Sequence, residues 1–195
     1  MKIARWYLAL LPAMFLLPST ARADHKQALL SGKILTMSVP GKGIWPGRAM
    51  AIVDAKAKDV YKLLTGVASY KSFVPRIVDS KKVNNDVFWL KGKFPWPIKH
   101  ATVKVKVKQG KKGGAYVMVW KMVSGTFKKY EGAAWIQPFG NRCILTYQML
   151  MVPKIIAPEA LMMKGLRNAV LEVVQAVRKR VKKKIASSTA TAPAA

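Results

Sequence analysis

The feature that most constrains the fold is a run of β-strand patterns that leads into one long amphipathic helix. Short strands joined by tight turns are expected at 77–83, 87–94, 103–108, 115–123, 126–137 and 142–152. This order predicts an antiparallel meander, not a parallel sheet with crossover helices. The helix expected over 158–184 carries an inner apolar stripe of Met163, Leu166, Val170, Val173, Val177 and Val181. Because the stripe has only the sheet to pack against, we expect the sheet to curve around the helix.

The two faces of one expected strand differ in chemical character. The stretch VKVKVK at 103–108 alternates valine with lysine, and strict alternation is the period of a β-strand. One face of this strand is therefore apolar and the other is cationic. The next strand is apolar on both faces over YVMVW at 116–120. The sheet thus carries more apolar surface than a single buried face requires.

The part of the chain before the meander predicts one strand and two short helices. Residues 48–53 predict the strand, and AKAKDVYKLL at 55–64 predicts a helix that stops at Gly66. A second short helix over 67–73 is ended by Pro75.

We expect the folded domain to span 46–185. It follows a lead-in at 24–45, in which 33–39 fits a first short strand, and precedes a small polar tail at 186–195 that we expect to be disordered.

The N-terminus has the pattern of a cleavable secretory signal peptide, expected over 1–23. Lys2 and Arg5 precede an apolar run over 6–17, and the small-residue segment Ala21-Arg22-Ala23 follows. The run is about a dozen residues long, whereas a helix that spans a bilayer needs ~20. We therefore expect cleavage after Ala23 and a periplasmic or otherwise secreted protein.

The chain is strongly basic, with 35 Lys and Arg residues against 8 Asp and Glu residues, a formal charge of +27. Three of these cations and none of the acids lie in 1–23, so the mature chain carries +24. This charge favours polyanions such as anionic lipid head groups, lipopolysaccharide or nucleic acid. An exported protein meets lipid surfaces far more often, so we expect no nucleic-acid partner. Cys143 is the only cysteine, so no intramolecular disulfide forms.

Two stretches carry a family pattern. In AIVDAKAKDVYKLLTGVASYKSFVPRI, 51–77, an Asp-Ala helix start, a Tyr-x-x-Leu-Leu core and a Tyr…Phe-x-Pro end recur. FPWPIKHA, 94–101, is a proline-tryptophan corner. Together they resemble the START and polyketide-cyclase superfamily, the SRPBCC or Bet v 1-like group. START proteins carry a Pro followed shortly by Arg-Asp at the second position, where Ala101 and Thr102 stand here.

The resemblance covers about 46–182 and implies an α+β helix-grip fold. In that fold a curved antiparallel sheet of about six to seven strands surrounds the long C-terminal helix, and two short helices follow the first main strand. The resemblance also implies that a lipid or other apolar ligand lies between the sheet and the helix.

The sequence lacks the residue combinations that catalysis or metal binding needs. His25 lies near the expected mature N-terminus, His100 lies in a turn, and the 8 acidic residues are scattered. We therefore expect no metal, no cofactor and no enzymatic activity. Because some members of the resembled superfamily are cyclases or dehydratases, His100, Tyr147 and Glu131 stay open as general acid–base groups of an alternative, exported enzyme.

The inward faces of the strands and helix hold more apolar side chains than a plain core requires, although a plain core accounts for any one of them. Methionine suits a wall that adapts to a flexible chain, and each ligand CH₂ removed from water is worth ~0.8 kcal/mol. The residues expected to line a ligand cavity are Phe88, Leu90, Phe94, Val103, Val105, Val107, Tyr116, Met118, Trp120, Met122, Met149, Met151, Met163 and Leu166.

Two groups of cations exceed what solubility, edge protection or helix-dipole complementation requires. Near an anionic leaflet each cation is worth ~1 kcal/mol, so we expect these groups to dock the protein on a membrane. They are Lys104, Lys106, Lys108, Lys111 and Lys112, and Arg178, Lys179, Arg180, Lys182, Lys183 and Lys184.

These patterns predict an exported, monomeric carrier that binds a lipid or other apolar ligand and presents it at anionic membrane surfaces. A third class also stays open, a cationic binder of lipopolysaccharide or nucleic acid with a dry core. Phospholipid, sterol, hopanoid, polyene and fatty acid all fit as the ligand.

Overall fold

The computed structural model describes residues 19–40, 43–94, 99–155 and 158–190. Its main element is one sheet of 8 strands in the order β1-β2-β8-β7-β6-β5-β4-β3, in which every neighbouring pair is antiparallel. The strands are β1 Leu35–Ser38, β2 Gly47–Val53, β3 Ile77–Lys82, β4 Val87–Lys93, β5 His100–Lys112, β6 Ala115–Gly125, β7 Phe127–Phe139 and β8 Arg142–Pro153. The meander expected from the sequence is thus present.

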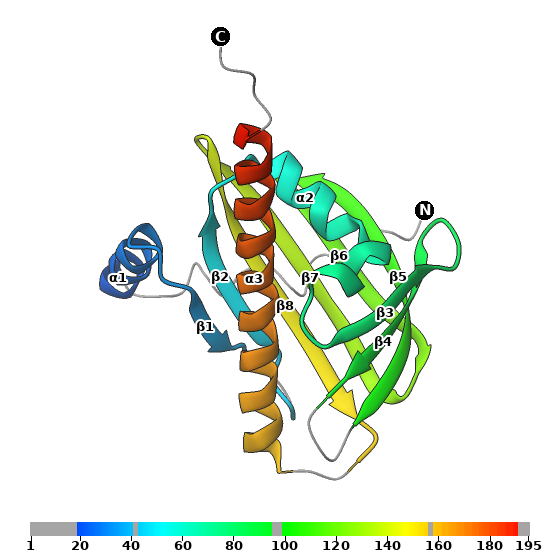
Figure 1. The fold of residues 1–195 in the computed structure, drawn as a ribbon. Helices are drawn as coiled ribbons and strands as arrows, with labels where there is room; N and C mark the ends of the chain where they lie inside the picture. Colours follow the sequence, from blue (N-terminus) through cyan, green and yellow to red (C-terminus); the bar gives the residue numbers. More distant parts are fainter. Residues whose placement is uncertain (1–18, 41–42, 95–98, 156–157, 191–195) are drawn as a thin grey trace.

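The helices are α1 Ser19–Leu30, α2 Ala57–Thr65, the 3₁₀-helix η3 Val67–Ser72 and α3 Glu159–Ala190. The sheet curves, and α3 lies across its inner face with α2 beside it (Figure 1). The long helix packs mainly on β2 and β8, while η3 packs on β3. The α+β helix-grip arrangement expected from the sequence is confirmed.

The sheet has one strand more than the six to seven expected. The extra strand is β1, which pairs with β2 in the register Leu35↔Met50 to Ser38↔Gly47. It lies within the lead-in expected over 24–45, where 33–39 fits a short strand. The lead-in therefore extends the edge of the sheet.

Helix α1 has no counterpart among the sequence-based expectations, because STARADHKQALL carries no clear apolar stripe. Its main anchor is Leu29, which packs with Met50 and Ile52 on the outer face of β2. The helix runs across the position after Ala23 at which we expect cleavage. The apolar run of the expected signal peptide, 6–17, lies outside the described residues.

The C-terminal helix is longer than the sequence indicated, since it continues to Ala190. Residues 186–190, expected to be disordered, instead extend it, because adding residues to an established helix costs little when alanine is among them. Residues 191–195 lie outside the described residues, as does the proline-tryptophan corner at 95–97.

The inner stripe of α3 packs as expected. Leu166, Val170 and Val177 are almost completely buried, and Val174 joins them. Met163, at the start of the stripe, is only partly buried. The helix approaches β2 so closely at Gly47 that a Cβ there would lie 2.7 Å from the Leu166 carbonyl oxygen. A side chain at this position would push α3 off the sheet.

The valine and lysine faces of β5 are also confirmed. Val103, Val105 and Val107 are buried between the sheet and the helices, whereas the lysines between them are exposed. Val105 pairs with Phe88 on β4 and with Met122 on β6. Register alone therefore places the apolar side chains of three strands on the same inner face.

Candidate functional site

The inner face of the sheet encloses a cavity of about 10 Å³, close to the space that one water molecule needs. Its lining comes from η3 and five neighbouring strands and consists of Val67, Tyr70, Leu90, Val105, Val107, Met118, Trp120, Tyr130 and Tyr147. Small-molecule sites usually measure ~300–1,000 Å³. The interior is thus apolar and concave but almost filled by its own side chains.

Five of the residues expected to line a cavity do so: Leu90, Val105, Val107, Met118 and Trp120. Four others are buried in the surrounding core, namely Phe88, Val103, Met149 and Leu166. Phe94, Tyr116, Met122 and Met151 are partly buried and pack against that core, while Met163 lies outside it. The expected residues therefore describe the core as a whole. Those among them that line the cavity come from β4, β5 and β6.

The sequence interpretation missed Val67, Tyr70 and Tyr130 as lining residues and treated Tyr147 only as an acid–base group. Alternation within β7 and β8 could have indicated that Tyr130 and Tyr147 share the inner face, since Ala134 lies directly opposite Tyr147. The sequence carries no signal that Tyr70 lines the cavity. Its position depends on the packing of η3 against β3, which is a contact between elements and not a local pattern.

Burial raises the pKa of each of the three tyrosine phenols. It raises the pKa of Tyr130 to about 12, and it raises those of Tyr70 and Tyr147 well above the usual value for tyrosine, with neighbouring phenols adding to the effect. The Tyr70 hydroxyl donates a hydrogen bond of 2.6 Å to the carbonyl oxygen of Leu64. All three phenols are therefore neutral hydrogen-bond donors at ordinary pH.

Aromatic stacking fixes the rings around the cavity. The ring centroids of Trp120 and Tyr147 lie 5.1 Å apart, and those of Phe127 and Tyr130 lie 5.6 Å apart. A Cβ at Gly132 would lie 2.2 Å from the Trp120 ring, so only glycine lets the indole lie over β7. The wall of the cavity next to β7 is therefore rigid and aromatic.

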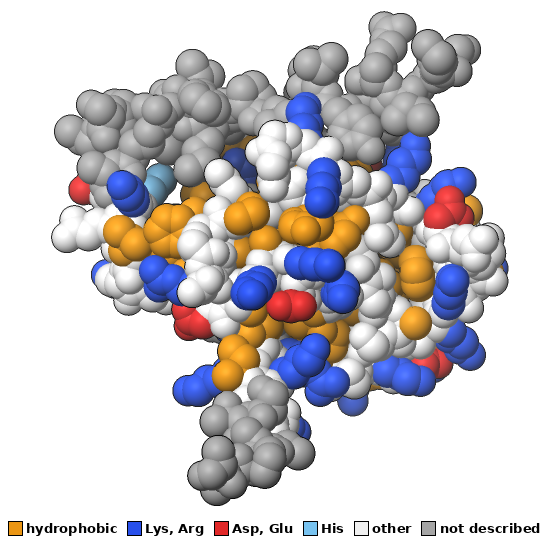
Figure 2. Space-filling view, turned by 90° about the horizontal axis from the view of Figure 1, so that it is seen from above, with side chains coloured by type: hydrophobic (Ala, Val, Ile, Leu, Met, Phe, Trp, Pro, Cys, Tyr) orange, Lys and Arg blue, Asp and Glu red, His pale blue; other side chains and the backbone are white. Residues whose placement is uncertain are grey.

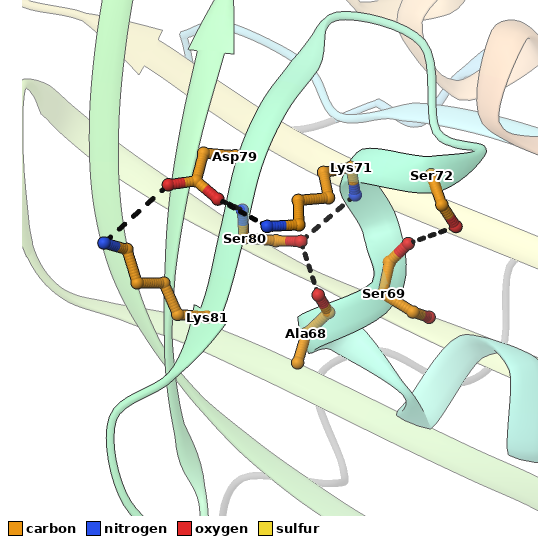
Figure 3. A network of polar contacts seen from close by, with 7 residues as sticks. All are labelled: Ala68, Ser69, Lys71, Ser72, Asp79, Ser80 and Lys81. Atoms are coloured by element: carbon orange, nitrogen blue, oxygen red, sulfur yellow. Dashed lines mark hydrogen bonds and ion pairs between the residues drawn. The ribbon is translucent and has the colours of Figure 1, made fainter.

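A polar network holds η3, and with it Tyr70, against β3 (Figure 3). The buried Ser80 hydroxyl donates to the Ala68 carbonyl at 2.7 Å and accepts from the Lys71 backbone N–H at 3.1 Å. The Lys71 ammonium binds the Asp79 carboxylate at 3.1 Å. This hydrogen bond, with that from the Ser80 backbone N–H, lowers the pKa of Asp79.

The groups left open as an acid–base set lie apart. Tyr147 faces the interior, but His100 is exposed at the start of β5. The Glu131 carboxylate binds Lys129 at 2.9 Å and lies opposite Lys121 and Leu150 in the sheet. Within the described residues, no cluster of three or more His, Cys, Asp or Glu side chains could hold a metal ion. Burial raises the pKa of the Cys143 thiol to about 12.

Lys104, Lys106 and Lys108 of β5 lie on the outer face of the sheet, opposite the cavity, whereas Lys111 has the strand parity of the inner face and lies over the Tyr116 ring. Lys104 pairs in register with Trp89, whose ring also lies under the Lys81 ammonium, with 5.1 Å between that nitrogen and the ring centroid. Lys106 binds Asp86 at 3.1 Å. Lys108 is exposed, as are Lys111 and Lys112 at the end of the strand. The expected cationic row is thus present.

The second expected cationic group divides in two. Lys179, Arg180, Lys182, Lys183 and Lys184 are exposed on α3. Arg178 instead donates 2.8 Å hydrogen bonds to the carbonyls of Ile52 and Gly32, so it ties the lead-in to the domain. Figure 2 shows Lys and Arg side chains spread over the end of the molecule at which α3 finishes, with few acidic side chains among them. No helix of the described residues is long and apolar enough to cross a membrane.

A sequence model of the family described as "Polyketide cyclase / dehydrase and lipid transport" matches residues 53–178. The chain belongs to this family. A search of curated proteins found no match. The family match begins at the end of β2 and includes every element that lines the cavity.

Solved structures with the same fold are distant in sequence. A STAR-related lipid transfer protein fragment from Xanthomonas axonopodis is 19% identical with a TM-score of 0.65, covering 77% of this chain and 93% of that one. Human STARD10 is 13% identical with a TM-score of 0.64, covering 92% of this chain and 88% of that one. A START superfamily protein from Mycobacterium smegmatis is 15% identical with a TM-score of 0.64, covering 71% and 97%. At these identities the similarity shows the fold.

Proposed function

We propose that this protein binds a lipid or other apolar small molecule between the sheet and α3, and presents it at anionic membrane surfaces. The observation that carries the proposal is the lining of the inner face, where the described residues supply apolar and aromatic side chains and no charged group. Lipid transport is one of the roles in the description of the family, which also names polyketide cyclases and dehydrases.

A lipid-sized ligand does not fit the closed interior, so binding requires the cavity to expand. Met118 lines the cavity, and Met149 and Met151 line the neighbouring core. Methionine repacks at low cost because its side chain is unbranched and flexible. The start of α3 is loosely held, since Leu161 is 60% exposed and Met163 is only partly buried. Expansion toward this end of the helix disturbs the fewest buried contacts.

We propose further that the protein is exported, monomeric and not an enzyme. Export rests on the signal-peptide pattern of 1–23 and predicts that the mature protein begins at Asp24. Mass analysis of the protein recovered from the periplasm or medium tests this, and an intact Met1 would exclude cleavage. The lack of catalysis is supported by the separation of His100, Glu131 and Tyr147 described above.

Native mass spectrometry of the protein purified from its own host tests the ligand directly. We expect an apolar molecule to co-purify with the wild type. Val105→Phe places a larger ring against the cavity and should lower the bound fraction at least tenfold. Val123→Phe is the matched control, because Val123 is 58% exposed and the same change there should leave binding intact. Full binding by a folded Val105→Phe variant would place the ligand elsewhere.

The near-filled interior favours a second candidate, a cationic surface binder with a dry core whose partner is lipopolysaccharide. That candidate predicts no co-purified apolar ligand and no effect of Val105→Phe on any binding. The same pair of variants therefore separates the two functions.

A further inference from the structure

The cavity is lined by hydrogen-bond donors that have no acceptor among the residues that the structure describes. Of the three tyrosines in the lining, only Tyr70 has its hydroxyl engaged, by the Leu64 carbonyl. Within the described residues, the hydroxyls of Tyr130 and Tyr147 have no hydrogen-bond partner, and neither has the indole N–H of Trp120. Tyr147 and Trp120 are both only 4% exposed.

These donors retain access to free space. No fully enclosed side-chain nitrogen or oxygen of the described residues lacks a partner, so the unpaired atoms keep some accessible area. For side chains as buried as Tyr147 and Trp120, the accessible space next to them is the cavity that they line. Buried polar groups in native proteins are nearly always paired, and unpaired ones call for a reason.

The lack of charged side chains in the described lining restricts which ligand groups can accept hydrogen bonds from these donors. Among the described residues, no Lys, Arg, His, Asp or Glu contributes to the cavity wall. Burial of a carboxylate or phosphate without a countercharge is strongly unfavourable. An uncharged oxygen, such as a hydroxyl or a ketone or ester carbonyl, accepts hydrogen bonds from phenols without this penalty.

We propose that the hydroxyls of Tyr130 and Tyr147 form a polar subsite that binds the uncharged oxygen of an otherwise apolar ligand. The subsite rests on the proposed binding function and narrows it. It favours neutral alcohols, sterol-like molecules and ketones over fatty acids, and it excludes a charged phospholipid head group from this end of the cavity. In the closed protein a single water molecule fits the same place.

The test compares three probes of equal chain length: 1-hexadecanol, hexadecane and palmitate. Each is incubated with the mature wild-type protein, and bound probe is counted by native mass spectrometry. We expect 1-hexadecanol to bind roughly tenfold more tightly than hexadecane, the effect of about one hydrogen bond. Palmitate at neutral pH should bind less tightly than 1-hexadecanol.

Tyr147→Phe removes one hydroxyl and keeps the ring that stacks on Trp120. It should abolish most of the preference for 1-hexadecanol over hexadecane, measured as the ratio of the two affinities. Tyr116→Phe is the matched control, since Tyr116 packs at the edge of the core and does not line the cavity. Because the Tyr147 hydroxyl has no partner in the closed protein, Tyr147→Phe should also leave the melting temperature unchanged or raise it.

The outcomes separate this proposal from the function on which it rests. Binding of hexadecane and 1-hexadecanol with equal affinity would uphold the apolar site and overturn the polar subsite. Tighter binding of palmitate than of 1-hexadecanol would overturn the neutral-ligand assignment, as would a marked fall in melting temperature in unliganded Tyr147→Phe. If none of the probes binds, both the subsite and the proposed function fail.

Discussion

Tyr70, Tyr130 and Tyr147 are poor candidates for general acid–base catalysis at neutral pH. An efficient catalytic group has a pKa near the working pH, whereas burial moves these phenols in the opposite direction, to about 12 for Tyr130. Donation of a hydrogen bond needs only the neutral phenol. The residue-scale chemistry of the cavity thus favours recognition over proton transfer.

The same pKa shifts predict how stability depends on alkaline pH. The folded protein holds the Tyr130 proton up to about pH 12, whereas an unfolded tyrosine loses it near pH 10. The folded state then binds more protons than the unfolded state, so this contribution is complete below pH 10 and is lost between pH 10 and 12. Loss of this contribution from Tyr130 alone should lower the free energy of unfolding by about 3 kcal/mol over this window.

Ultraviolet absorbance of phenolate and circular dichroism, followed together from pH 9 to pH 13, check this prediction. We expect the phenolate signal of the three tyrosines that line the cavity to develop only as the fold is lost. Tyr130→Phe should shift the alkaline unfolding midpoint upward. Ionisation of every tyrosine near pH 10 in a protein that keeps its circular dichroism would contradict the prediction.

Helix α3 and η3 pack on different parts of one continuous sheet. Helix α3 packs on β2 and β8, whereas η3 packs on β3 at the other edge of the sheet. The Arg76 guanidinium, in the turn before β3, joins the two through a bidentate pair with Glu172 of α3, at 2.8 Å for Nε and 2.5 Å for Nη2. This ion pair is placed to keep the interior closed.

We expect Glu172→Gln to ease opening of the interior. The change keeps the shape of the side chain and removes its charge, and a pair about one-third exposed is worth ~1 kcal/mol. The melting temperature should fall by about 2–4 °C. Amide hydrogen exchange in 72–77 should speed up severalfold, and so should release of a bound apolar probe.

Glu131→Gln is the control for this element-scale prediction. The Glu131 carboxylate is exposed to a similar degree, but its partner Lys129 belongs to the same strand. Loss of the Glu131–Lys129 ion pair should change neither amide hydrogen exchange in 72–77 nor the rate at which a bound apolar probe is released. Equal effects of the two substitutions would mean that Arg76 and Glu172 do not hold the interior closed.

Most elements could be predicted from the sequence because their signals are local. The period of 103–108 fixed both faces of β5, and the stripe from Leu166 to Val181 fixed the buried side of α3. The position of α1 in the lead-in was not predicted, since this helix has no clear apolar stripe and its one buried hydrophobic side chain among those described is Leu29. Arg178 was assigned to the surface because sequence shows its charge but not the carbonyls of Ile52 and Gly32.

The cavity could be predicted only in outline. Alternation indicates which side chains face inward, but it does not indicate whether they fill the space, which depends on volumes and rotamers. A surplus of apolar residues therefore suggested a large cavity where the structure has about 10 Å³. The tyrosine subsite depends on residues from η3, β7 and β8, and only the three-dimensional packing brings those together.

At the scale of the whole molecule, the two cationic groups lie on different sides of the sheet. Lys104, Lys106 and Lys108 occupy the outer face, while α3, which carries 182–184, covers the inner face (Figure 1). Docking through Lys104, Lys106 and Lys108 would place the outer face of the sheet against the lipid, whereas docking through 182–184 would place the end of α3 there.

We expect membrane docking to depend on the lysines of β5, and two triple variants of equal charge test this. Replacing Lys104, Lys106 and Lys108 by Gln lowers the net charge by as much as replacing Lys182, Lys183 and Lys184. The first variant should bind anionic vesicles up to roughly a hundredfold more weakly at low salt, at ~1 kcal/mol per cation. Lys106 should contribute least, because Asp86 already pairs with it.

The effect should shrink as salt is raised, since exposed charges are screened over ~8–10 Å near physiological ionic strength. Co-sedimentation with vesicles at low and moderate salt measures it, and native mass spectrometry checks that the bound apolar ligand is unchanged, because the valines between the lysines are untouched. An equal loss in both variants would mean that net charge alone draws the protein to the surface. A loss confined to the 182–184 variant would move the docking face to the end of α3.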